Sequence, residues 1–222
     1  ETVDDNFIDL EFKIFEGPKV IVERINIKGN TVTNDSVIRS ELILDEGDPF
    51  SKIKIDKSIS ILKARNIFKK INYKVFDGSS KNVKIMDIVV EEMPTGEIAA
   101  GAGTGTDGTT LSFSVAENNY LGEGLIVDTS LEASESTLRG GISVVNPNYN
   151  YSGNSLEYGF SSLKTDRPNS GYENTLTQLN IGTRFEQYDD IYLSPNLELS
   201  FDDMKVDGKA SDRLKKQAGT FT

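Results

Sequence analysis

Apolar and polar residues alternate along much of the second half of the chain, a pattern typical of β-strands with one apolar face. The clearest segment is residues 191–202, whose odd positions are apolar and whose even positions are mainly polar. Successive side chains on a strand point to opposite faces, so this segment predicts one apolar and one polar face. Residues 111–115, 125–133, 155–160 and 178–185 repeat the pattern.

The length of these segments separates two kinds of β-protein. Strands of globular proteins have about 5 to 6 residues, whereas a tilted strand that crosses a bilayer needs roughly 9 to 11. The longest alternating segments fall in the second class, so we expect residues 94–222 to form antiparallel transmembrane β-strands. A soluble, ligand-binding β-protein that carries an adaptor domain is an alternative, and it would dissolve without detergent.

Residues 18–93 contain strand and helix patterns in the order β-α-α-β-β. Strands are expected at residues 19–28, 71–75 and 83–90, with turns at Gly29-Asn30 and at residues 77–80. One helix is expected to begin at Asp35 and to end before Gly47 and Pro49. A second should follow Ser51, where residues 55, 59 and 62 are apolar at helical spacing. The pattern predicts two helices that cover a small sheet.

Residues 6–18 resemble residues 82–94, and both segments end in proline. Similarity at a fixed offset is the signature of an internal repeat. We therefore expect residues 1–17 to be the last strand of a preceding copy and residues 18–93 to be a complete copy. The chain begins at Glu1 without methionine, and we expect it to be an internal segment of a longer secreted precursor with an incomplete barrel.

Composition argues against several classes of function. The net charge is −11, with most of the acidic excess in residues 94–222, so nucleic acid is not an expected partner. The chain has no cysteine and no histidine, and thus lacks a thiolate nucleophile, the usual general base and the usual zinc ligands. Asp189 and Asp190 are interpreted as solvated loop charges. We expect neither an enzyme nor a cofactor or metal site.

Gly103, Gly105 and Gly108 match the spacing G-x-G-x-x-G of dinucleotide-binding loops. That fingerprint requires a helix directly after it, because the helix N-terminus binds the pyrophosphate. Residues 109–115 alternate like a strand instead, which argues against nucleotide binding.

Residues 18–93 resemble a POTRA (polypeptide-transport-associated) domain in element order, in the Gly29-Asn30 turn, and in the segments 46–50 and 66–68. The segments GEIAAGAGTGTDG, ENNYLGEG and NPNYNYSGNSLEYG resemble the first barrel strands of the POTRA-plus-barrel superfamily. The resemblance implies an outer-membrane protein with its POTRA domains in the periplasm. It also implies a non-enzymatic role: receiving unfolded barrel precursors and folding and inserting them into the outer membrane.

The same resemblance implies four partners: unfolded outer-membrane protein precursors, accessory assembly lipoproteins, periplasmic chaperones and outer-membrane lipid. A related transporter that secretes polypeptides would share the same plan. The number of POTRA domains upstream would help to distinguish the two.

Two strand edges are candidate functional sites. The strand at residues 71–75 should be the exposed edge of the small sheet and could bind an extended client by β-augmentation, through Ile71, Asn72, Tyr73, Lys74 and Val75. The alternative is an edge protected by its lysines. In the resembled family the first barrel strand meets the last at a lateral seam, where precursors pair. Here that strand is expected at residues 97–103, with Ile98, Ala99, Ala100, Gly101, Ala102 and Gly103. Its glycines could instead serve only to turn the chain.

Four further residues have two interpretations each. The resemblance places Glu41 where the family contacts a peripheral lipoprotein, although a solvated glutamate is the simpler interpretation. Tyr120, Tyr149 and Tyr151 lie beside turn residues, either at the membrane interface or in ordinary turn packing.

Overall fold

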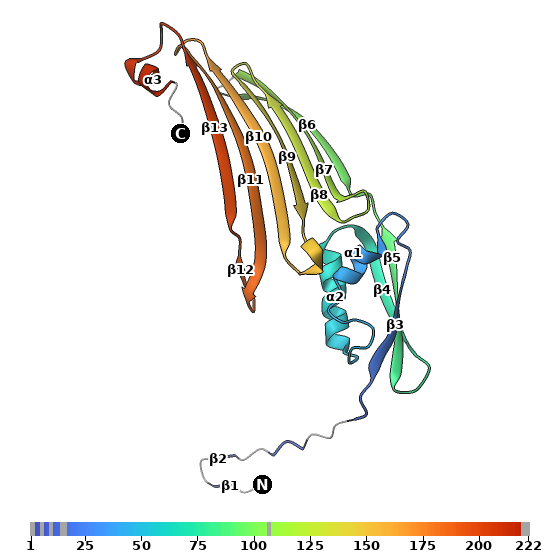
Figure 1. Ribbon diagram of the computed structural model, residues 1–222. Helices are drawn as coiled ribbons and strands as arrows, with labels where there is room; N and C mark the ends of the chain where they lie inside the picture. The colour runs from blue at the N-terminus through green and yellow to red at the C-terminus, as the bar shows by residue number, and fades with distance from the viewer. Residues whose placement is uncertain (1–2, 5–6, 9–10, 14–16, 106–107, 219–222) are drawn as a thin grey trace.

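The computed structural model describes residues 3–4, 7–8, 11–13, 17–105 and 108–218. Figure 1 shows a small mixed module at one end of a large, curved antiparallel sheet. At the N-terminus β1 (Val3–Asp4) pairs with β2 (Phe7–Ile8). The rest of the strand expected over residues 1–17 either lies outside the described residues or is not a strand, and its origin in a preceding repeat stays a prediction.

The small module has the predicted order β-α-α-β-β. It consists of β3 (Ile21–Lys28), α1 (Asp35–Ser40), α2 (Lys52–Ala64), β4 (Phe68–Asp77) and β5 (Val83–Glu92). Its sheet has the order β3-β5-β4, with β3 parallel and β4 antiparallel to the central β5. One core joins the sheet to the helices. Its buried residues include Ile25, Ile38, Leu44, Ile55, Leu62, Ile67, Met86 and Ile88.

The first helix is shorter than the sequence predicted. It ends at Ser40 rather than before Gly47, and residue 41 caps it. The amide of Ile43, two residues after the cap, donates to Ser58 Oγ of α2 at 2.8 Å, and Leu44 is fully buried. Tertiary packing against α2 therefore replaces the continuing helix. At the second helix, Ser51 accepts a hydrogen bond from the amide of Lys54, which confirms the predicted cap.

The large sheet contains eight strands. They are β6 (Gly96–Gly105), β7 (Gly108–Tyr120), β8 (Leu125–Ala133), β9 (Thr137–Asn146), β10 (Ser155–Arg167), β11 (Tyr172–Tyr188), β12 (Ile191–Leu193) and β13 (Asn196–Val206). Each strand pairs with the next along the chain, except that β12 and β13 both pair with β11. A strand follows Gly108 directly, so the helix that a nucleotide site would require is absent there.

The register of the large sheet sorts its side chains into one apolar and one polar face. One continuous row of cross-strand partners is apolar at six of its seven positions: Ile98, Val115, Thr129, Ile142, Phe160, Leu179 and Leu199. A parallel row on the opposite face contains Glu97, Ala116, Asp128, Ser143, Gly159, Asn180 and Glu198. The alternation predicted from the sequence is therefore one surface shared by all strands.

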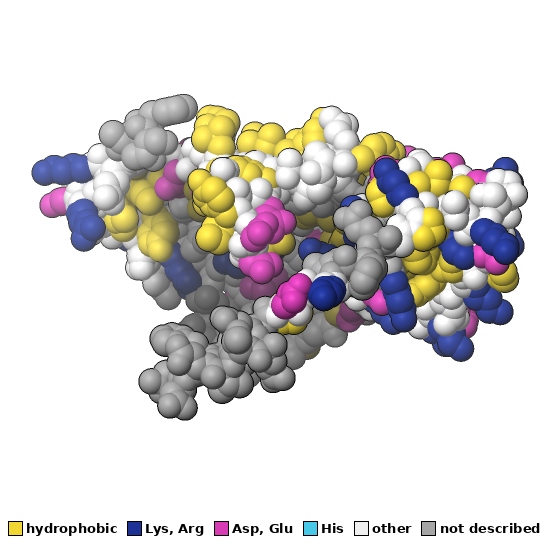
Figure 2. All heavy atoms as spheres, turned by 90° about the horizontal axis from the view of Figure 1, so that it is seen from below, with side chains coloured by type: hydrophobic (Ala, Val, Ile, Leu, Met, Phe, Trp, Pro, Cys, Tyr) yellow, Lys and Arg dark blue, Asp and Glu magenta, His cyan; other side chains and the backbone are white. Residues whose placement is uncertain are grey.

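The apolar face is exposed instead of covering a core. Leu111, Leu131, Leu197 and Leu199 have relative exposures between 51% and 61%. Seen from below, hydrophobic side chains gather along one margin of the molecule (Figure 2). An exposed apolar surface that extends across several strands marks contact with protein or membrane. A barrel wall in lipid presents such a face.

The long strand predicted at residues 191–202 is interrupted. Ser194 and Pro195 separate β12 from β13, because proline has no amide to donate to the ladder. The second part continues to Val206, and the segment after it contains the short helix α3 (Asp212–Gln217). Among the described residues, no helix is both long and apolar enough to span a bilayer.

Candidate functional site

Strand β4 forms one edge of the small sheet. It pairs with β5 over Phe68–Asp77, and the described residues provide no strand on its other side. Ile71 is buried and Tyr73 is half-buried toward the helices, whereas Asn72 and Lys74 are exposed. The five residues expected to bind a client, 71–75, thus lie together on an edge strand.

The opposite edge, β3, is covered. The segment that follows α1 runs along it: the amide of Gly47 donates to the Val22 carbonyl at 2.7 Å, and that of Val22 donates to the Asp48 carbonyl at 2.9 Å. The Glu46 carboxylate accepts from the amide of Ile25 at 2.9 Å. Covered edges do not add strands, so β4 is the edge of this module with backbone groups available for pairing.

Strand β6 forms one edge of the large sheet. It is longer than the expected 97–103, because it pairs with β7 from Gly96 to Gly105. All ten of its residues are exposed, and no described strand pairs with its outer side. The six seam residues, 98–103, lie within this edge strand.

The small module and the large sheet are joined by hydrogen bonds at the β7–β8 turn. The amide of Asn34 donates to the Gly122 carbonyl at 2.8 Å. The side chain of Asn119 is buried: it donates to Thr33 Oγ1 at 2.9 Å and accepts from the amide of Gly124 at 2.8 Å. We call these contacts, together with the Arg65 and Asn148 contacts described below, the junction.

Gly122 is required at the junction by both conformation and space. Its φ is +74°, and an added Cβ would lie 2.1 Å from the Val32 carbonyl oxygen. We expect Gly122→Ala to open the junction, with faster amide exchange in residues 32–34 and 119–124 and a cost of about 1 to 3 kcal/mol.

Gly153 provides the matched control for this substitution. Its φ is +76°, but a Cβ added there meets nothing within 4 Å. Gly153→Ala therefore carries the backbone strain without the clash, and should leave exchange at residues 32–34 unchanged. Equal exchange rates in the two variants would show that the close approach of Gly122 does not hold the junction.

A single carboxylate holds the loop of the small module that meets the turn. Glu92 accepts from the amides of Thr31, Val32 and Thr33 at 2.9, 3.0 and 2.7 Å, and from Thr31 Oγ1 at 2.7 Å. Burial raises the pKa of Glu92, but these hydrogen bonds lower it by more, to about 2. The loop is therefore built around an ionised glutamate.

Because the pKa of Glu92 is lower in the folded protein than in the unfolded chain, its stabilising effect is present above about pH 4.5 and is lost as the pH falls toward about 2. We expect Glu92→Gln to destabilise the loop by about 2 kcal/mol at neutral pH. Amide exchange at residues 31–33, measured for both proteins between pH 7 and pH 3, should show a difference that narrows on acidification. A difference independent of pH would contradict this role.

Glu41 and Arg65 form a largely buried ion pair at the junction. Their side chains are each 11% exposed, and Arg65 Nε lies 3.5 Å from Glu41 Oε1. Arg65 also donates through Nη2 to the Gly124 carbonyl at 2.6 Å. Burial raises the pKa of Glu41, and the Arg65 charge partly offsets this effect. The interpretation of Glu41 as a solvated glutamate is therefore wrong, whereas its contact with a lipoprotein stays a prediction.

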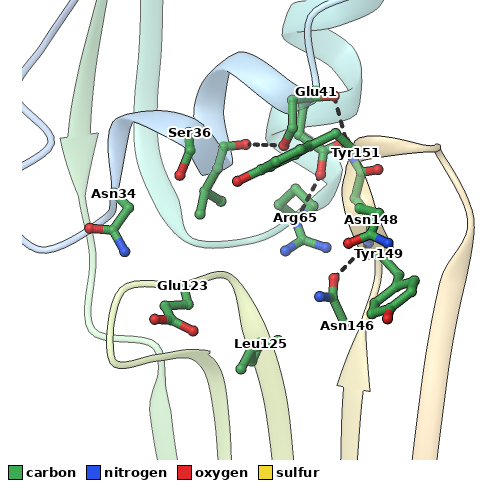
Figure 3. Close-up of a pocket in the computed structure, with 13 residues that line it drawn as sticks. Asn34, Ser36, Glu41, Arg65, Glu123, Leu125, Asn146, Asn148, Tyr149 and Tyr151 are labelled. Carbon is green, nitrogen blue, oxygen red and sulfur yellow. Dashed lines mark hydrogen bonds and ion pairs between the residues drawn. The ribbon is translucent and has the colours of Figure 1, made fainter.

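The turn between β9 and β10 makes the second connection. It contains the 3-10 helix η1 (Tyr149–Tyr151), and Asn148 Nδ2 donates to the Ser40 carbonyl at the end of α1 at 3.0 Å. Residues from both parts of the chain, among them Glu41, Arg65, Asn148 and Tyr151, line a pocket of about 310 Å³ between them (Figure 3). Tyr149 and Tyr151 are 44% and 67% exposed and line this pocket, and their position at the membrane interface stays a prediction.

Sequence patterns did not reveal the residues that make the junction. Arg65, Glu92 and Asn119 come from three distant parts of the chain, and no spacing links them. Two signals were present: Gly122 and Gly124 flank one residue in a turn, and Asn119 precedes them. In the part of the chain that the structure describes, no three acidic residues are grouped as metal ligands would be.

Comparison with known proteins identifies both parts. Residues 20–93 match the POTRA family model, described as a surface antigen variable number repeat. The chain is 30% identical over 231 residues to the outer membrane protein assembly factor BamA of Neorickettsia risticii, covering 96% of this chain and 29% of that protein. It is 28% identical over 153 residues to BamA of Neisseria meningitidis serogroup B, covering 68% of this chain and 19% of that protein. The chain thus spans less than a third of these curated relatives.

Solved structures share the fold. BamA from Haemophilus ducreyi lacking POTRA domains 1–3 superimposes with a TM-score of 0.71 at 20% identity, over 85% of this chain and 37% of that one. CdiB from Acinetobacter baumannii gives a TM-score of 0.61 at 10% identity, over 86% and 39%.

The mixed module and the unclosed sheet define a POTRA-plus-barrel protein of the outer membrane, with the POTRA domain on the periplasmic side. Within that class, the chain is similar over nearly its whole length to a segment of BamA, the outer membrane protein assembly factor.

Proposed function

We propose that this chain is the last POTRA domain and first barrel strands, residues 18–93 and 94–222, of a factor that assembles outer-membrane proteins. The best support is the match to BamA relatives, which runs continuously through both parts of the chain at 30% identity. In this proposal unfolded barrel precursors bind edge β4, and edge β6 templates their strands into the membrane. The mechanism has no covalent step. Insertion is favoured because every backbone group of a strand in lipid must be paired.

Accessory assembly lipoproteins and periplasmic chaperones are the proposed partners in the periplasm, with Glu41 as a proposed lipoprotein contact. Only 11% of its side chain is exposed, so a lipoprotein that contacts it must approach through the pocket beside Arg65.

The second candidate function is secretion of polypeptides through the barrel. Two CdiB structures, from Acinetobacter baumannii and Escherichia coli, have the same fold, with TM-scores of 0.61 and 0.60. Their identities to this chain are 10% and 15%, so they support a shared fold rather than a shared activity.

Reconstitution distinguishes the two functions. The full-length protein in phospholipid vesicles should accelerate folding of a urea-denatured barrel precursor, measured by protease protection and heat-modifiable electrophoretic mobility. Passage of an added polypeptide into the vesicle lumen, without faster precursor folding, would overturn the assembly proposal in favour of secretion.

Photo-crosslinking tests the client edge. A crosslinking amino acid at Lys74 on β4 should capture unfolded precursor several-fold more efficiently than one at Arg24 on β3. Both side chains are exposed on the same small sheet, but the β3 edge is covered by residues 46–50. Equal capture at the two positions would point to non-specific contact with the POTRA surface instead of β-augmentation.

A further inference from the structure

Two exposed aliphatic side chains are held on a rigid part of the junction. Val32 is 67% exposed and Leu121 is 77% exposed. Their backbones are fixed, because the Val32 amide donates to Glu92 and the Gly122 carbonyl accepts from the amide of Asn34. Leu121 also has a φ of +55°, a conformation that is uncommon for a residue other than glycine. The fold thus keeps these apolar groups exposed at a conformational cost.

These side chains lie next to the end of the lipid-facing surface of the sheet. Tyr120, which is 46% exposed, is the cross-strand partner of Leu125. Leu125 lies two residues before Val127 and therefore on the same face of β8, the face that carries the apolar rows. Leu121 and Gly122 follow at once in the turn. The headgroup region extends the bilayer by roughly 5 to 7 Å beyond the hydrocarbon on each side, so this turn lies at its depth.

The POTRA domain approaches this lipid-facing side of the strand ends. Leu125 and Asn146 have the register of the apolar face, on β8 and β9 respectively. Both line the junction pocket together with Val37 and Ser36 of α1 (Figure 3). Lipid that surrounds this part of the barrel would therefore meet the POTRA domain as well as the barrel turns.

We propose that Val32, Tyr120 and Leu121, here named the junction knuckle, insert into the periplasmic leaflet of the outer membrane and dock the POTRA domain on the lipid. Tyrosine and aliphatic side chains favour this interface, and such groups enter it by roughly 5 to 10 Å. Continuity with the lipid-facing surface favours phospholipid over a protein as the occupant. The proposal depends on the membrane location of the chain and not on its role in assembly.

Site-specific fluorescence tests the proposal on the full-length protein in phosphatidylethanolamine and phosphatidylglycerol vesicles. This chain has no cysteine, so single cysteines at Val32 or Leu121 can carry an environment-sensitive label once any cysteine outside it is removed. Ile53 is the matched control, because it is an aliphatic residue of the same domain, 82% exposed, at the far end of α2 from Arg65.

Lipids with a spin label near the headgroup should quench the labels at Val32 and Leu121 at least about twofold more than the label at Ile53, with the reverse order for aqueous iodide. Iodide quenching at all three positions alike would overturn the proposal. So would labels at Val32 and Leu121 that become protected only when accessory proteins are added, since a protein would then be the occupant. Because no client is present, the result is separate from that of the assembly assay.

Discussion

Ala99→Thr combined with Gly103→Thr in β6 is expected to slow precursor insertion about tenfold. Glycine weakens a strand by roughly 0.5 to 1 kcal/mol relative to alanine, and a β-branched residue adds a comparable preference for the strand. Together the two changes should stabilise the paired state of β6 by about 1.5 kcal/mol, which is about tenfold in the population of an opened seam. Both residues are exposed on the polar face of the sheet, and a Cβ at Gly103 meets nothing within 4 Å.

The measurement is the folding rate of a denatured precursor in vesicles that contain the variant. Gly101 is left unchanged because a Cβ there would lie 2.8 Å from Ser112 Oγ, which would confuse a clash with a change in strand preference. Gly140→Thr in β9 is the control, since its Cβ has ordinary contacts and β9 is paired on both sides. If the double variant inserts precursors as fast as this control, the glycines of β6 serve only to turn the chain, and the seam interpretation fails.

Arg65→Met is expected to destabilise the junction by about 3 kcal/mol. Removing one partner of a buried ion pair leaves the other charge uncompensated, which costs about 3 to 5 kcal/mol. The lower figure applies because the Arg65 Nε and Glu41 Oε1 atoms are 3.5 Å apart, too far for a strong hydrogen bond. Methionine keeps the aliphatic stem, so the loss reports the charge and the hydrogen bond to Gly124. The pKa of Glu41 should also rise further in the variant, because the Arg65 charge that lowers it in the unsubstituted protein is removed.

Urea unfolding of the full-length protein, followed by amide exchange in α2 and residues 119–124, would measure this loss. Adding Glu41→Gln to Arg65→Met should recover part of it, since no buried charge then remains unpaired. Lys63→Met is the matched control: Lys63 is exposed in the last turn of the same helix, and its loss should change stability by less than about 0.5 kcal/mol. If Arg65→Met lowers stability no more than Lys63→Met does, a structural role for the Glu41–Arg65 pair is contradicted.

Hydrophobic alternation predicted the large sheet well because the period of a strand depends only on backbone geometry. Leu197 and Leu199 were assigned to one face and Glu198 to the other from spacing alone, and the register across seven strands agrees. The order β-α-α-β-β was likewise predicted, because turns such as Gly29-Asn30 and the stripe of Ile55, Ile59 and Leu62 are local signals.

Local signals failed where a partner from another element replaced them. The first helix was predicted to reach Gly47, but Ser58 of α2 takes the amide of Ile43 and the helix stops at Ser40. Pro195 was placed inside a strand because it fits the apolar alternation, yet it has no amide to donate to β11 and the regular strand is interrupted there, although its carbonyl still accepts from the amide of Thr183. In each case, the hydrogen bonds that the backbone can or cannot make outweighed periodicity.

The sequence by itself determined the fold class and the two faces of the barrel wall, because both follow from repeating local patterns of side chains. It also indicated which strands would be edges. Only the tertiary structure decided how the POTRA domain meets the barrel: Glu92, Arg65 and Asn119 each form a hydrogen bond with a group more than fifty residues away along the chain. It also turned Glu41 from an apparent surface charge into half of a buried pair, since burial depends on what packs against a residue and not on its neighbours in sequence.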